Sequence, residues 1–141
     1  MLRQLTGKLA RSISQSPSHT KSQLRYFRNT SSRLQMFGEA GPATFEEHVV
    51  QGQKLTIVDF HADWCPPCKM LDPILQRVMA QEHEVDYLKI DTDKATDLAA
   101  KYKIASLPTV VAFKHGKEYS RFVGLVNEEA VRNFIANLRE S

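Results

Sequence analysis

The stretch KLTIVDFHA, residues 54–62, limits the fold of this chain more than any other part of its sequence. Its apolar residues are almost continuous: Leu55, Ile57, Val58 and Phe60. A strand with one face in water would instead alternate apolar and polar side chains. The run is therefore typical of a central strand covered on both faces, and a sheet built around it needs helices on each side.

Helix and strand signals alternate along the rest of the chain. Apolar residues between positions 71 and 78 recur at helical spacing, and residues 85–91 predict a second strand. A helix capped by Thr92 or Asp93 is expected to follow and to run to about Tyr102.

The remaining signals complete an α/β pattern. Residues 108–123 predict an antiparallel hairpin that turns at Gly116, and Asn127 predicts the cap of a last helix. Near the start, Thr44 can cap a short helix that ends at Val50. Strands that alternate with helices and end in a hairpin predict one α/β domain, with a mixed central β-sheet flanked by helices on both faces.

Charge separates the first part of the chain from the rest. Residues 1–38 carry seven basic residues and no acidic one, whereas the chain from Glu39 onward has a net charge of −4. The basic pI therefore does not indicate nucleic-acid binding by the folded part. No apolar run is long enough to cross a membrane, so no membrane partner is expected.

The first 14 residues have the pattern of a mitochondrial transit peptide. On a helix, their leucines would share one face and their basic residues the other, as in such peptides. We expect a leader over residues 1–36, cleaved between residues 27 and 38, a folded domain over residues 37–141, and a location in the mitochondrial matrix. A disordered basic arm or a surface-binding helix is the alternative for this segment.

The only two cysteines, Cys65 and Cys68, lie between the predicted central strand and the helix that follows it. If Cys65 is the N-cap, Pro66 and Pro67 occupy the first helical positions, where a missing N–H costs least. The positive helix end would lower the pKa of the Cys65 thiol, and the thiolate is the nucleophile. We expect the more exposed Cys65 to attack a disulfide and the more buried Cys68 to resolve the mixed disulfide.

Two other interpretations of the cysteine pair fit less well. A zinc site needs four ligands, and no pair of histidines has the spacing that would complete it, so no metal is expected. A purely structural disulfide over so short a ring would remove little entropy from the unfolded chain.

The chain resembles the thioredoxin family over residues 34–140, through VDFHADWCPPCK, KIDTD, SLPTVVAFKHGK and FVGL in that order. The resemblance implies the thioredoxin fold and a monomeric protein-disulfide reductase with no bound cofactor. It also implies electrons from NADPH through a thioredoxin reductase, and delivery to peroxiredoxins and other disulfide-bearing proteins.

The resemblance also implies roles for residues outside the cysteine pair. Asp59 matches a buried acid that accepts the proton of Cys68, and Lys89 matches a lysine beside that acid. From the residues alone, Asp59 is equally well explained as a structural carboxylate, and His61 is expected only to pack near the site.

A substrate groove is implied as well. Pro108 matches a cis-proline that faces the cysteines, which would leave the backbone of Leu107 free to pair with an extended substrate segment. Trp64 and Gly124 match residues that border this groove, the glycine by permitting close backbone approach. A tryptophan at an ordinary core or rim position is the alternative for Trp64.

One residue departs from the family motif. Pro66 stands where the family usually has glycine, which removes an N–H near the Cys65 sulfur and should raise its pKa. Because of this departure, two other functions stay open: a dedicated oxidoreductase for a narrow set of client proteins, and a binding module switched by its redox state.

Overall fold

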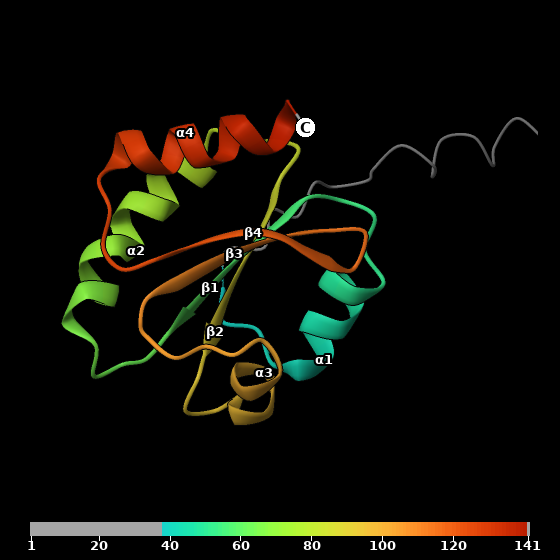
Figure 1. Ribbon diagram of the computed structural model, residues 1–141, viewed down its shortest axis with the longest axis vertical. Coiled ribbons are helices and arrows are strands. Elements are labelled where there is room, and N and C mark those ends of the chain that lie inside the picture. The colour runs from blue at the N-terminus through green and yellow to red at the C-terminus, as the bar shows by residue number, and fades with distance from the viewer. Residues whose placement is uncertain (1–37, 141) are drawn as a thin grey trace, which may run out of the picture. The chain divides into compact units, whose positions relative to one another are not determined.

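The computed structural model describes residues 38–140, which form a four-stranded sheet with helices on both faces (Figure 1). The strands are β1 (Thr56–His61), β2 (Asp86–Asp91), β3 (Thr109–Lys114) and β4 (Lys117–Val123). Their order in the sheet is β2-β1-β3-β4, with β1 parallel to β2 and the other two pairs antiparallel. The predicted mixed sheet is confirmed, and every residue of β1 is buried. The leader predicted over residues 1–36 lies outside the described residues.

Two apolar layers cover the sheet. Helices α2 (Pro66–Met79) and α4 (Glu128–Arg139) pack on one face, around side chains such as Ile57, Leu75 and Ile135. On the other face lie α1 (Pro42–Phe45), the π-helical segment η2 (Glu46–Val50) that continues it, and α3 (Thr96–Lys101) (Figure 1). Among the described residues, no helix is long and apolar enough to cross a membrane.

Two predicted helix starts are wrong. The first helix begins at Pro42 rather than after Thr44, because a proline in the first turn lacks only an N–H that would be unpaired there. Helix α3 begins after Ala95 and not after Thr92 or Asp93. The hydroxyl of Thr92 instead donates to the backbone oxygen of His61 at 3.1 Å. The Asp93 carboxylate accepts a hydrogen bond from a side chain of the loop after β1.

The sheet register brings three segments to one edge. Strand β1 ends at His61, next to the start of β3, since Phe60 pairs with Thr109. Thr109 in turn pairs with Val123 at the end of β4. The loop into α2, the segment before β3 and the loop after β4 therefore meet at this edge, as the left-hand side of Figure 1 shows.

Candidate active site

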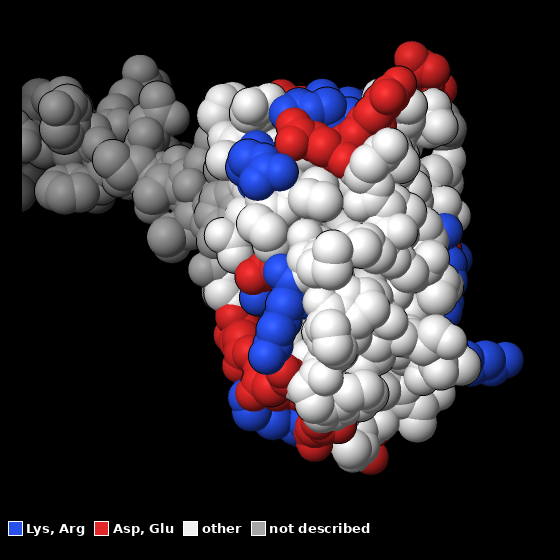
Figure 2. Space-filling model, turned by 90° about the vertical axis from the view of Figure 1, so that its left-hand side faces the viewer, with Lys and Arg blue, Asp and Glu red and all other residues white. Residues whose placement is uncertain are grey.

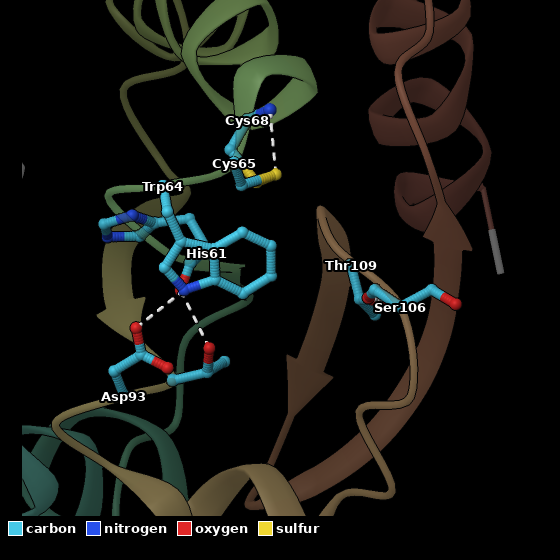
Figure 3. The surroundings of a disulfide bond; sticks show 8 residues. His61, Trp64, Cys65, Cys68, Asp93, Ser106 and Thr109 are labelled. Atoms are coloured by element: carbon cyan, nitrogen blue, oxygen red, sulfur yellow. Dashed lines mark hydrogen bonds between the residues drawn. A yellow bond between two sulfur atoms is a disulfide. The ribbon is translucent and has the colours of Figure 1, made fainter.

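A disulfide between Cys65 and Cys68 lies at the start of α2 (Figure 3). Cys65 is the N-cap of the helix in extended backbone conformation, and Pro66 and Pro67 follow as its first two residues, as the sequence predicts. The backbone N–H of Cys68 donates to the Cys65 sulfur at 3.3 Å. The sulfur of Cys65 therefore lies against the positive end of α2, which favours negative charge on it after reduction.

The prediction that Cys65 is more exposed than Cys68 is wrong for this oxidised state, since both residues are 3% exposed. The bond holds both sulfurs together in one apolar cluster with Ala62 and Leu107. The two cysteines differ in their surroundings instead. Cys68 lines an adjacent cavity of about 200 Å³, whereas Cys65 does not.

That cavity contains the buried acid. Asp59, on β1, lines it with Cys68, is 1% exposed, and has no hydrogen-bond partner for either carboxylate oxygen among the described residues. Burial raises the pKa of Asp59 from 3.8 to about 7, although the charge of Lys89 opposes this and that of Asp72 adds to it. The cavity is large enough for water, which could carry a proton between Cys68 and Asp59.

Lys89 lies beside Asp59 but forms its ion pair with another acid. Its ammonium nitrogen is 2.9 Å from Oδ1 of Asp72, which lies in α2 and lines the same cavity. Sequence reasoning missed Asp72. The sequence could have indicated Asp72, because it lies four positions after Cys68 and therefore on the same face of the predicted helix.

His61 lines the cavity from the last position of β1. It is buried, and its Nε2 atom is 3.6 Å from Oε1 of Glu39, a second acid that sequence reasoning missed. Burial, followed by the charge of Lys89, lowers the pKa of His61, although Glu39 and other acids oppose the shift. The expected packing position near the site is confirmed.

The residues predicted to border a substrate groove lie in the loops near the cysteine pair. Trp64 is 67% exposed, so it is a rim residue rather than a core residue, and its indole N–H donates to Oδ2 of Asp93 at 2.8 Å (Figure 3). The peptide bond between Leu107 and Pro108 is cis, and Leu107 packs against the disulfide.

The backbone conformation of Gly124 gives a reason for glycine beyond the predicted close approach of a substrate, which stays a prediction. Its N–H donates to the backbone oxygen of Pro108 at 2.8 Å. A Cβ atom at this position would meet nothing within 4 Å, but the φ angle is +92°. The backbone conformation therefore requires glycine here, because side-chain-bearing residues avoid this region.

Near the disulfide, Cys68 lines a cavity with several acidic and basic residues, but the wider face of the protein has few charges. The face that carries this edge of the sheet shows a broad uncharged area, bordered on one side by lysine and acidic side chains (Figure 2). Trp64, Val123 and Leu125 are exposed large apolar residues in or next to the loops at this edge of the sheet. Such a surface suits an extended protein segment better than a small charged molecule.

We expect a Pro66→Gly variant to lower the pH midpoint of Cys65 alkylation by up to about one unit, because a restored N–H near the sulfur stabilises its charged form. The measurement is the rate of iodoacetamide alkylation of the reduced protein against pH. A matched Pro42→Gly variant, at the start of α1 and outside the site, should keep the wild-type midpoint. An unchanged or higher midpoint in Pro66→Gly would show that this N–H does not act on the sulfur.

The known proteins that resemble this chain in sequence are thioredoxins. The thioredoxin family model matches residues 37–137. Mitochondrial thioredoxin from Rattus norvegicus is 38% identical over 120 residues, which cover 84% of this chain and 72% of the rat protein. Mitochondrial thioredoxin from Bos taurus is 42% identical over 95 residues, or 67% of this chain. The chain thus spans 57% of the length of that bovine relative.

A solved structure with a similar fold is also a thioredoxin. The structure of a mutant thioredoxin from Halobacterium salinarum matches with a TM-score of 0.64 and 32% sequence identity. The match covers 71% of this chain and 87% of the solved one.

Proposed function

The chain belongs to the thioredoxin family, and from this premise we propose that it is a protein-disulfide reductase of the mitochondrial matrix. Members of the family are protein-disulfide oxidoreductases, and this chain carries the redox-active cysteine pair. The main support for the proposal is the placement of the two cysteines. Cys65 caps α2, and Cys68 lines a cavity with Asp59, a buried acid whose pKa is about 7.

The reaction proceeds in two exchange steps. The Cys65 thiolate attacks a substrate disulfide, which breaks that bond, forms a mixed disulfide and releases one substrate sulfur as a thiolate that takes up a proton. The Cys68 thiolate then attacks the Cys65 sulfur, which releases the second substrate sulfur and forms the Cys65–Cys68 disulfide. Two electrons pass to the substrate, and this structure represents the oxidised product.

Asp59 is the proton acceptor for the second step. Cys68 must lose its proton before it attacks, and a carboxylate with a pKa of about 7 is ionised in part of the molecules at neutral pH. Lys89 and Asp72 act as positioning residues, since their ion pair borders the same cavity and their charges act on Asp59 in opposite directions.

The groove holds the substrate for the first step. Leu107, beside the disulfide, offers its backbone to an extended segment of the client protein. Trp64 and Gly124 border this groove, and the uncharged face at this edge of the sheet accommodates client proteins of different sequence.

The reductase needs electrons from outside the chain. We assign these to NADPH through a thioredoxin reductase, with peroxiredoxins among the acceptors and no cofactor bound to the protein itself. The similarity to mitochondrial thioredoxins and the transit-type pattern of residues 1–36 support the matrix location and a working domain over residues 37–141.

A Cys68→Ser variant tests the proposal. It should accumulate covalent mixed disulfides with many proteins of an oxidised mitochondrial extract, because the attack by Cys65 proceeds but the resolving thiol is gone. Non-reducing gels and mass spectrometry identify the adducts, and a Cys65→Ser/Cys68→Ser double variant is the control that should trap none.

Three outcomes separate the candidate functions. Many trapped proteins support a general reductase, and adducts with only one or two proteins would indicate a dedicated oxidoreductase. No adducts, together with noncovalent partner binding by the double variant, would favour a redox-switched binding module over the proposed reaction.

A further inference from the structure

We propose that Glu39, His61 and Asp63 form a binding site for a divalent transition-metal ion of the zinc class, on the solvent side of the cavity that contains Asp59. All three residues line this cavity, and neither Glu39 nor Asp63 belongs to the exchange reaction described above. The proposal does not rest on the cysteine pair, for which the sequence predicts no metal.

The three side chains already converge. Each offers one ligand atom, and these atoms all lie within 4.8 Å of one another. Zinc holds nitrogen and oxygen ligands at about 2.0–2.2 Å, so ligands around a tetrahedral ion are about 3.4 Å apart. With three protein ligands, a water molecule would take the fourth position. The His61 Nε2 and Glu39 Oε1 atoms, 3.6 Å apart, are near that spacing. Asp63 is exposed, and a side-chain rotation can bring its carboxylate closer.

The buried ring nitrogen of His61 independently indicates a bound ligand. The His61 side chain is only 8% exposed. Its Nε2 atom is buried and has no hydrogen-bond partner among the described residues, although it lies at the cavity with two carboxylates. A buried polar atom without a partner is costly, and most such atoms in proteins have one. A metal ion would supply this partner.

The backbone holds two of the three ligands in place. His61 is the last residue of β1. Glu39 forms an isolated parallel bridge with Lys89 of β2, and the N–H of Ala40 donates to the Lys89 backbone oxygen at 2.8 Å. A site with preformed ligand positions loses less conformational entropy when the ion binds.

Local charges and ligand types indicate the class of ion. The Nζ atom of Lys94 lies 3.3 Å from Oε2 of Glu39, whereas the other carboxylate oxygen, Oε1, faces His61. The positive charges of Lys69 and Lys89, at the same cavity, oppose any cation, so we expect reversible binding rather than a permanent structural ion. An imidazole nitrogen with two carboxylates suits zinc better than magnesium or calcium, which prefer oxygen ligands alone.

Titration calorimetry with zinc chloride on the oxidised full chain tests the proposal. The Cys65–Cys68 disulfide removes the two thiolates as competing ligands. The wild type should bind zinc saturably, and Asp63→Asn and Glu39→Gln should each weaken binding at least tenfold, as loss of a ligand or its support does. Asp97→Asn, an exposed acid on α3, is the matched control and should bind as the wild type does.

A second readout identifies the site directly. The imidazole resonances of His61 in ¹H–¹⁵N spectra should shift on addition of zinc, and should not shift with magnesium at the same concentration. Both substituted acids are exposed, so the variants should keep the wild-type fold, which thermal unfolding checks.

The proposal is overturned if no saturable binding occurs up to about 1 mM zinc. It is also overturned if Asp63→Asn and Glu39→Gln bind zinc as the wild type does, or if the His61 resonances stay unchanged. None of these results affects the reductase proposal, since the experiment uses the oxidised protein and measures no thiol exchange.

Discussion

Replacement of Asp59 by Asn should raise the free energy of unfolding of the oxidised protein by about 4 kcal/mol at mildly alkaline pH and leave it nearly unchanged near pH 4. Burial raises the pKa of Asp59 from 3.8 to about 7 in the folded protein. One pKa unit corresponds to about 1.4 kcal/mol, so this shift corresponds to about 4 kcal/mol.

The direction of the effect follows from proton binding. Between pH 3.8 and about 7, Asp59 is protonated in the folded protein and ionised in the unfolded chain. The folded state therefore holds the extra proton, and stability falls as the pH rises through this window. Above pH 7 the full cost of a buried carboxylate remains. Asparagine has the same shape without the charge, so the variant avoids this cost.

Urea unfolding of both proteins at several pH values measures the effect. The difference between variant and wild type should grow from near zero at about pH 4 to its maximum above pH 7. Asp97→Asn, an exposed acid on α3, should change stability by less than about 0.5 kcal/mol at every pH. If the Asp59→Asn protein is less stable than the wild type, or if the difference in stability does not depend on pH, then burial does not raise the pKa of Asp59 as described.

A Cys65→Ser variant should lose protein-disulfide reduction by at least about three orders of magnitude, as enzymes do when their nucleophile is removed. A serine hydroxyl does not ionise at neutral pH, so the start of α2 would hold no nucleophile. Cys68 does not replace it, because Cys68 lies inside the first turn of α2 rather than at its N-cap and lines the inner cavity with Asp59.

Reduction of a disulfide-bonded test protein, with dithiothreitol as the electron donor, measures this loss. Thermal unfolding of the variant checks that it still folds, and Lys69→Gln, at an exposed neighbouring position, should keep most of the activity. Substantial activity in Cys65→Ser together with its loss in Cys68→Ser would reverse the roles assigned to the two sulfurs.

The residues near the cysteines show which parts of the site can be predicted from sequence. The N-cap position of Cys65 follows from two prolines that fit a first helical turn, and this local geometry is confirmed. The start of α3 was predicted wrongly, because Thr92 and Asp93 are good caps in isolation but bond to the loop after β1. The equal burial of the cysteines depends on their disulfide, which local sequence does not specify.

Sequence by itself determined the alternation of strands and helices, the two-sided burial of β1 and the placement of a cysteine pair at a helix start. These depend on side-chain periodicity and capping, which act over a few residues. Only the tertiary structure decided that Asp72 joins Lys89, that Glu39 reaches His61 and that Asp59 has no hydrogen-bond partner among the described residues. Those contacts join residues far apart in the chain, and the resulting burial, rather than residue type, sets the pKa of Asp59.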